Sequence, residues 1–436
     1  MNELAVLLTV YLAIVPYYAR RQRRLASHTR AVAATAVQDG TRPVSVDVIV
    51  TCYNEQPALL ASCLSSLQQQ DYCGRINVWV VDDGSRNRAD LLPVLAAKIR
   101  PGWQVLLSDE NYGKRVAQAF ALEEGDGELI VTVDSDTVVA LDGIRRIVAP
   151  FRHRRVGAVT GRLRALNAAD SWLSQAIDTR YGLLCDRERA AQGLFGSVLC
   201  CAGPFSAFRR TAVQQVLERY LAPRGLNGQR RSGDDLELTN LVLAQGYRSE
   251  YQPAAEAWTQ VPATILEFAR QQRRWNRSFY CELPRILRIA TRRHPYMVLD
   301  VAARALAPAL FAAGLLVAAA DAVRAPQHVM LDAVALALMI IASVELLPSW
   351  HRAGRQFALR YGLVFVGLLL PVRFWAACTV LLRDRWGTRQ LPDRPLPDLG
   401  AEPKGMVLSD VVALPSVEGD GVVQLARRLT PTAAEA

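Results

Sequence analysis

Short apolar runs separated by polar turns occupy the middle of the chain and predict a buried sheet. VSVDVIV at 44–50, INVWVV at 76–81 and LIVTV at 129–133 are continuous and rich in β-branched residues. Such runs are typical of strands that are covered on both faces. Strands and helices alternating at this spacing predict a parallel α/β sheet. The first intervening helix shows an apolar stripe at Leu59, Leu60, Cys63, Leu64 and Leu67, and we expect Asn54 to cap it.

Longer apolar runs lie near both ends and predict membrane helices. The first covers residues 3–18 and is followed by four arginines between positions 20 and 24. A cleaved signal peptide carries its positive charge before the apolar run, so we interpret this segment as an uncleaved anchor. The arginines that follow it predict that its C-terminal end is cytoplasmic. Its length also suits an interfacial helix. The later runs, at 297–323, 329–349 and 361–382, are each long enough to span, and an interfacial or re-entrant course stays open for one of them.

These runs predict the domain organisation of a multi-pass plasma-membrane protein with a cytoplasmic catalytic domain. Asp300, Arg304 and Arg373 lie within the late runs, where charged groups face protein, line a water-filled path or snorkel near helix ends. The predicted order is an anchor at 1–20, a linker at 25–43, the soluble domain at 44–260, interfacial helices at 261–295, the membrane region at 296–390 and a flexible, proline-rich tail at 391–436.

Composition narrows the partners of the protein. The 436 residues carry a formal net charge of +10, and most of the positive charge is arginine, which suits phosphate groups and anionic membrane lipid. We expect no nucleic-acid partner, because no helix-turn-helix, zinc-finger or RNA-binding signature is present. The eight cysteines form no C-x-x-C pair, so we interpret them as reduced core residues rather than zinc ligands.

Polar side chains follow each of the three predicted strands. Ligands of parallel sheets bind beyond the carboxyl ends of the strands, so we expect a functional edge there. Two carboxylates spaced as D-x-D can share a divalent cation, Mg²⁺ or Mn²⁺, that bridges nucleotide phosphates, whereas an isolated D-x-D is more often an Asx-turn. The residues concerned are Tyr53 and Glu55, Asp82 and Asp83, and Asp134 and Asp136.

Two further motifs fit a nucleotide at this edge. In NYGKR, Lys114 and Arg115 can meet a diphosphate, while Gly113 permits close backbone approach. In RSGDDLELTN, Asp234 and Asp235 begin an apolar-periodic helix. One acid or Ser232 suffices to cap it, which leaves the other acid free as a general base. No P-loop or G-x-G-x-x-G occurs, and the histidines all lie outside these motifs.

Taken in order, VDVIVTCYNE, VWVVDDGS, ENYGKR, VTVDSDT, CCAGPFSAFRR, SGDDLELTN and QQRRW resemble the inverting, processive family 2 glycosyltransferases. Within this family the chain looks most like the hyaluronan synthases and the rhizobial chitin-oligosaccharide synthases, over about residues 44–390. The resemblance implies an α/β fold of GT-A type, with a parallel-rich sheet domain and transmembrane helices at both ends.

The resemblance also implies roles for individual residues. Asp83 would bind the uridine, Lys114 the diphosphate and Asp235 would be the catalytic base. Tyr53 and Glu55 would lie beside the nucleotide. The metal-binding motif would be Asp134 and Asp136, with Asp136 as the direct ligand. The Q-x-x-R-W motif would be Gln271, Arg274 and Trp275, with the tryptophan under the acceptor sugar. Near the acceptor would lie Cys201, Gly203 and Pro204.

The implied activity is polymerisation of a GlcNAc-containing glycan, with export of the growing chain. The hyaluronan-type prediction uses UDP-GlcNAc with UDP-glucuronate, and the alternative is a chitin-oligosaccharide synthase that uses UDP-GlcNAc alone. A non-processive transferase acting on a lipid phosphate is disfavoured by the Q-x-x-R-W motif. An inactive nucleotide-sensing membrane receptor or transporter is disfavoured by the intact Asp83, Asp136 and Asp235.

The segment RQQRRWNRSFY at 270–280 carries both a candidate site and a basic patch. On a helix, Gln271, Arg274, Trp275 and Ser278 share one face, and Arg270, Arg273 and Arg277 share a neighbouring one. We expect the first face to meet UDP and acceptor, and the second to lie toward lipid. Pro262 suits the first turn of this helix.

Overall fold

A mixed sheet of nine strands forms the centre of the described part of the chain, in the order β11-β3-β2-β1-β4-β7-β6-β10-β5. The computed structural model describes residues 3–35, 43–222, 224–225, 228–229, 233–324, 326–344, 364–380 and 406–410. The strands are β1 Val46–Cys52, β2 Ile76–Asp83, β3 Gln104–Ser108, β4 Leu129–Asp134, β5 Thr137–Val139, β6 Val156–Ala165, β7 Phe205–Arg209, β10 Arg248–Thr259 and β11 Met406–Asp410, with β8 Arg224–Gly225 and β9 Gly228–Gln229 as a separate pair.

The predicted strands β1, β2 and β4 are confirmed and lie side by side in parallel. The register places Thr51 beside Asp134 and Cys52 beside Asp82, so the polar residues that follow the strands meet at one sheet edge. β7 runs antiparallel between β4 and β6, and β5 and β11 are also antiparallel. The sheet is therefore parallel-rich, as predicted, but mixed.

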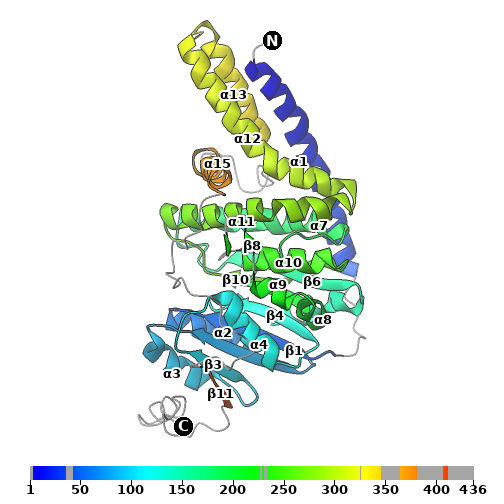
Figure 1. Cartoon of the computed structure of the whole chain (residues 1–436), viewed down its shortest axis with the longest axis vertical. Helices are drawn as coiled ribbons and strands as arrows, with labels where there is room; N and C mark the ends of the chain where they lie inside the picture. The colour runs from blue at the N-terminus through cyan, green and yellow to red at the C-terminus, as the bar shows by residue number, and fades with distance from the viewer. Residues whose placement is uncertain are drawn as a thin grey trace.

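The helices cover the sheet and extend away from it on one side. Figure 1 shows α11 lying between the sheet and the helices α1, α12 and α13, which project beyond it as a bundle. The principal helices are α1 Glu3–Thr35, α2 Pro57–Gln68, α3 Arg88–Lys98, α4 Lys114–Glu124, α5 Gly143–Val148, α6 Trp172–Leu183, α7 Ala190–Leu194, α8 Arg210–Gln214, α9 Leu217–Leu221, α10 Asp234–Ala244, α11 Ile265–Thr291, α12 Pro295–Arg324, α13 Val329–Val344 and α15 Leu370–Cys378. Shorter or π-type turns are η1 Ala149–Arg152, η2 Leu184–Arg189, η3 Pro326–His328 and η4 Phe365–Leu369.

Two predictions about where helices begin are wrong. Asn54 does not cap α2, which begins at Pro57 after Gln56. Instead Asn54 adopts a left-handed backbone conformation, and its side chain accepts a hydrogen bond from the Arg86 amide at 2.8 Å, which joins the ends of β1 and β2. Pro262 precedes α11 rather than lying in its first turn. Thr264 caps that helix in a reciprocal capping box with Glu267.

The N-terminal segment is a longer helix than the sequence indicates. α1 continues without interruption to Thr35, so the first part of the predicted linker 25–43 is helical. In the described residues, one helix, Pro295–Arg324, is long and apolar enough to cross a membrane. The N-terminal anchor and the other late spans stay predictions. The ends of the predicted runs 329–349 and 361–382, and the stretch between them, lie outside the described residues.

Asp300 and Arg304 of α12 contact protein groups, which is one of the placements that the sequence left open. Asp300 is fully buried and accepts a hydrogen bond from the Tyr18 hydroxyl of α1 at 2.6 Å. Arg304 forms an ion pair with Glu188 of η2. The predicted flexible tail 391–436 lies outside the described residues except for β11, which pairs with β3 at the sheet edge.

Candidate active site

A cavity of about 650 Å³ lies beyond the carboxyl ends of β1 and β4 and continues between η2, α10 and α11 toward α1, α12 and α15. This is the edge that the polar strand ends predicted. Tyr53 and Asp83 are not among the residues that line the cavity. The predicted site residues that do line it are Glu55, Lys114, Asp134, Asp136, Cys201, Gly203, Pro204, Asp235, Gln271, Arg274 and Trp275.

The D-x-D motif follows β4 directly and holds two differently placed carboxylates. Asp134 forms an ion pair with Lys114. Asp136 accepts hydrogen bonds from the hydroxyls of Thr137 at 3.2 Å and Thr259 at 3.0 Å. Burial, and then the carboxylates of Asp134 and Glu55, raise the pKa of Asp136 to about 7. This crowding of like charges is the environment that a divalent cation would relieve.

The adjacent basic residues Lys114 and Arg115 at the start of α4 make different contacts. Lys114 lines the cavity, and its contact with a diphosphate stays a prediction. The same prediction for Arg115 is wrong, because the Arg115 guanidinium is buried against Asp234 and Glu237, each at 3.0 Å. Consecutive residues of a helix point in different directions, which separates the two side chains. Gly113 precedes the helix with a φ of +90°, a conformation that favours glycine.

Asp83 is buried and shapes the loop that leads into α4. Its two carboxylate oxygens accept hydrogen bonds from the amides of Tyr112 at 2.8 Å and Gly113 at 2.9 Å. The structure therefore places Asp83 beneath the Lys114 loop, in contact with backbone. A direct contact between Asp83 and uridine stays a prediction.

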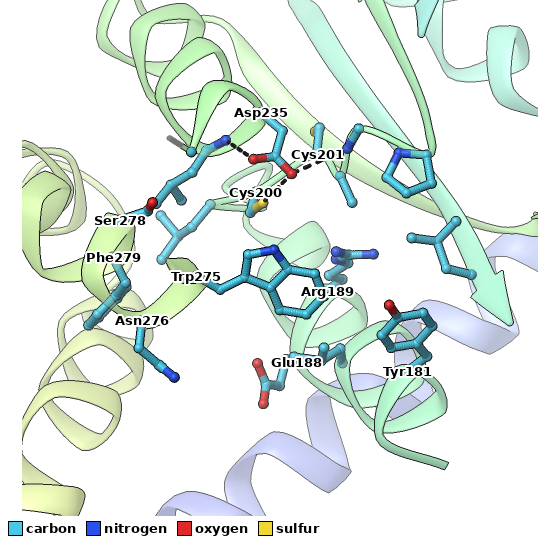
Figure 2. Close-up of a pocket in the computed structure, with 18 of the residues that line it drawn as sticks. Tyr181, Glu188, Arg189, Cys200, Cys201, Asp235, Trp275, Asn276, Ser278 and Phe279 are labelled. Carbon is cyan, nitrogen blue, oxygen red and sulfur yellow. Dashed lines mark hydrogen bonds between the residues drawn. The ribbon is translucent and has the colours of Figure 1, made fainter. Parts of the chain in front are cut away.

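Asp235 stands at the first turn of α10 and points into the cavity. Its Oδ2 accepts hydrogen bonds from the Gly203 amide at 3.2 Å and from the Cys200 thiol at 3.7 Å. Asp234 also lines the cavity, where it pairs with Arg115, and it is not the cap that the sequence suggested. Gly233 occupies the capping position, and Ser232 lies outside the described residues. Figure 2 shows Asp235 facing Trp275 across the cavity.

The Q-x-x-R-W residues of α11 form the wall opposite Asp235. Trp275 is about one-third exposed, at 37%, and its ring lies 6.4 Å from that of Tyr181, tilted by 31°. Arg270 and Arg273 are exposed on the neighbouring face. Arg277, which we expected beside them toward lipid, is instead buried. The two-face division therefore holds for the first two arginines only.

Sequence reasoning missed the residues that η2 and α6 contribute. Tyr181, Glu188 and Arg189 line the cavity beside Trp275, as Figure 2 shows. The stretch CDRERAAQ has the charge pattern of an ordinary solvated helix, so composition gave no signal. The π-type turn at Leu184–Arg189 that directs these side chains inward cannot be read from spacing.

The fold agrees with comparisons to known proteins. Residues 43–278 match the family described as "Glycosyltransferase like family 2". A solved structure with TM-score 0.55 and 19% identity, a mannosyltransferase from Pyrobaculum calidifontis in complex with GDP-Man and Mn²⁺, covers 85% of this chain and 99% of its own. Together with the family match, that likeness shows a glycosyltransferase fold of GT-A type.

Relatives in sequence narrow the class further. A protein of Sinorhizobium fredii named N-acetylglucosaminyltransferase is 38% identical over 89% of this chain and 94% of its own length. Proteins of the same name from Rhizobium meliloti and Bradyrhizobium diazoefficiens are 36% and 34% identical, over 90% and 93% of this chain and 91% and 85% of their own lengths. The chain belongs to glycosyltransferase family 2, in the group of the rhizobial N-acetylglucosaminyltransferases, and is a glycosyltransferase.

Proposed function

We propose that the protein transfers N-acetylglucosamine from UDP-GlcNAc to the hydroxyl of a growing glycan, with inversion at the anomeric carbon. The observation that carries the proposal is that one cavity is lined by the candidate base Asp235, by Trp275 as a candidate platform for the acceptor sugar, and by the acids Asp134 and Asp136 at the sheet edge. The names of the relatives support GlcNAc as the transferred sugar. The chitin-oligosaccharide alternative, with UDP-GlcNAc as sole donor, is therefore the first candidate.

The donor would occupy the sheet edge. Asp136, with Asp134, would hold Mg²⁺ or Mn²⁺, and their carboxylates suit such an ion because hard cations prefer oxygen and complete their shell with substrate phosphates and water. The related fold of the Mn²⁺-containing mannosyltransferase supports this choice. When bound, the cation would neutralise charge on the leaving diphosphate. Lys114 and Arg274 would bind the same diphosphate, and Tyr53, Glu55, Asp83 and Gln271 are proposed to shape the nucleotide end.

The acceptor would lie between Trp275 and Asp235. A tryptophan face packs on the apolar side of a sugar ring, and the Asp235 carboxylate would accept the proton of the attacking hydroxyl. The amide of Gly203 and the thiol of Cys200 hold that carboxylate toward the cavity. A single displacement needs no second nucleophilic carboxylate, so an α-linked donor gives a β-linked product.

A hyaluronan-type product, which requires UDP-glucuronate as second donor, is the other candidate. It is favoured by cationic groups on the acceptor side: Arg180, Arg189 and Arg373 line the cavity, and in the described part of the chain none of them forms an ion pair with a carboxylate. A uronate would suit these guanidinium groups.

We further propose that the chain works at the plasma membrane. α12 would span the bilayer, α1 and the late apolar segments would complete the membrane region, and the sheet domain would be cytoplasmic. The cavity reaches α1, α12 and α15, so the growing chain would leave the active site toward the membrane helices.

Labelled UDP-GlcNAc tests the activity. Membranes containing the protein are incubated with UDP-GlcNAc and Mg²⁺ or Mn²⁺, with and without UDP-glucuronate, and the product is digested with chitinase or hyaluronidase. Chitinase-sensitive oligomer from UDP-GlcNAc alone supports the first candidate. Product that requires both donors and yields to hyaluronidase supports the second. No transfer above the Asp235→Asn control in either mixture contradicts the proposal.

A further inference from the structure

A buried carboxylate outside the sheet edge joins three separate elements. Asp300 of α12 accepts hydrogen bonds from Tyr18 of α1 at 2.6 Å and from the Gln192 side-chain amide of α7 at 2.8 Å. It also forms an ion pair with Arg304 at 3.1 Å. Because a buried charge is stable only when its partners surround it, this cluster fixes how α1, α7 and α12 meet.

Gln192 connects Asp300 to the loop of residues 199–203, which lines the cavity. Its side-chain oxygen accepts a hydrogen bond from the Leu199 amide at 3.2 Å, while its NH₂ group donates to Asp300. On the opposite side of the same residue, the Leu199 carbonyl accepts from Asn240 of α10 at 3.2 Å. The backbone of Leu199 is therefore held between the Asp300 cluster and the helix that bears Asp235.

The loop beyond Leu199 makes the contacts that place the candidate base. The Cys200 thiol donates to Asp235, and the Gly203 amide donates to the same carboxylate oxygen. Thr239 of α10 accepts from the Cys201 amide at 2.9 Å. A displacement of Leu199 would thus move two donors of Asp235 and the residues that line the acceptor side of the cavity.

We infer that Gln192 is a positioning residue that sets the acceptor loop 199–203 relative to Asp235 from the side of the membrane helices. The inference rests on the proposed function, because it takes Asp235 as the base and the loop as part of the acceptor site. Only a neutral amide satisfies both neighbours, since it donates to the Asp300 carboxylate and accepts from the Leu199 amide at once. A glutamate at this position keeps the acceptor but puts a second carboxylate against the first.

Paired substitutions test the inference in the full-length protein in detergent or membranes. Gln192→Glu should raise KM for a β-linked GlcNAc oligomer acceptor and lower transfer roughly tenfold, because small misplacements of reacting groups slow catalysis strongly, while KM for UDP-GlcNAc changes little. Combining Gln192→Glu with Asp300→Asn should recover most of the loss, since the new amide at position 300 can donate to the new carboxylate at position 192. Tyr296→Phe is the matched control: it removes the hydrogen bond from the Tyr296 hydroxyl to Asp300 at 3.4 Å without touching Leu199 or the cavity lining, and its acceptor KM should match the wild type.

A second readout does not depend on the substrate. Alkylation of Cys200 by N-ethylmaleimide, followed by peptide mass spectrometry, should be faster in Gln192→Glu than in the wild type and slow again in the double variant, with the exposed Cys73 as internal reference. An unchanged acceptor KM with unchanged Cys200 labelling would overturn the inference. So would equal losses for donor and acceptor without rescue, or failure of both Gln192→Glu and Asp300→Asn to fold, since the cluster would then serve folding alone. If the wild type transfers no GlcNAc, the proposed function fails, and the labelling result still decides whether Gln192 holds the loop.

Discussion

Two pairs of acids, Asp134 with Asp136 and Asp234 with Asp235, line the cavity. Adjacent basic residues at the start of α4 form an ion pair with one acid of each pair. Lys114 pairs with Asp134 of the D-x-D motif, and Arg115 pairs with Asp234 beside the candidate base. The remaining acids, Asp136 and Asp235, line the cavity and form no ion pair in the described part of the chain. The first turn of α4 thus contacts acids of both the proposed donor end and the proposed acceptor end of the cavity.

The two pairings differ in burial, and that difference separates function from structure. Arg115 is buried with Asp234 and Glu237 and lies 4.5 Å over the ring of Tyr220, so it has a complete set of partners. Lys114 lies at the cavity wall, where Asp134 is its ion-pair partner. We expect Lys114 to exchange Asp134 for a diphosphate when a cation occupies the D-x-D motif, whereas Arg115 is a permanent brace.

The largest effect should come from the acid pair at the acceptor end. Asp235→Asn should lower transfer roughly 10²- to 10⁴-fold, the range that a general base contributes, because an amide cannot take the proton. UDP binding, measured by calorimetry, should change little. Asp234→Asn is the matched control, and it should retain most of the transfer. Equal losses of transfer activity in the two variants would contradict the assignment of Asp235 as the base and of Asp234 as a structural partner of Arg115.

Next in size is the effect of the brace itself. Arg115→Met should lower the free energy of unfolding by about 3–5 kcal/mol, because it leaves the buried Glu237 with only the more distant Arg285 at 3.7 Å and removes the cation from the partly buried Asp234. Thermal unfolding in detergent measures this. Lys114→Met should shift the same transition by far less, so matching shifts for the two variants would contradict the proposed division of roles.

A smaller effect is expected when Lys114 is tested in binding. Lys114→Met should weaken UDP affinity by about 1.5–3 kcal/mol, the contribution of a charge-assisted hydrogen bond, with little change in the melting temperature. Titration of UDP in the presence of Mn²⁺ measures the loss. UDP affinity equal to that of the wild type would show that the Asp134 pair persists in the complex.

The smallest effect concerns how Asp136 is oriented. Thr259→Val removes one hydroxyl donor from the Asp136 carboxylate and should weaken Mn²⁺ affinity by about 1 kcal/mol, the value of one hydrogen bond. The midpoint of the Mn²⁺ activation curve reports this change. Ser135→Ala, which removes a contact with Glu55 instead, should leave the midpoint closer to that of the wild type.

The sequence predicted the sheet edge well because its signals are local. Continuous β-branched runs identify β1, β2 and β4, and parallel pairing then brings Glu55, Asp134 and Asp136 to one edge without further information. The Q-x-x-R-W face of α11 follows from helical periodicity in the same way. These parts depend on spacing along a single strand or helix.

The predictions that are wrong concern residues whose burial or hydrogen bonds depend on segments distant in the sequence. Arg115 and Lys114 look equivalent in sequence, and only the packing of α9 and α10 against α4 buries the first. Arg277 is buried although its helical position predicted exposure. Asn54 and Pro262 suit helix caps locally, yet the link to Arg86 and the Thr264 capping box take precedence.

The packing of α1 has a consequence for the order in which the protein is assembled. α1 is synthesised before α12 and α13, but Tyr11 and Val15 are covered by Phe311 and Met339, and Tyr18 bonds to Asp300, 282 positions later in the chain. Closing so long a loop is slow, and intervening segments form their local contacts before it. The strands from β1 to β10 would therefore pair while the first half of α1 still lacks its partners in α12 and α13. A nascent chain that stops before Pro295 would contain every strand of the sheet except β11 and would leave Tyr11 and Val15 uncovered.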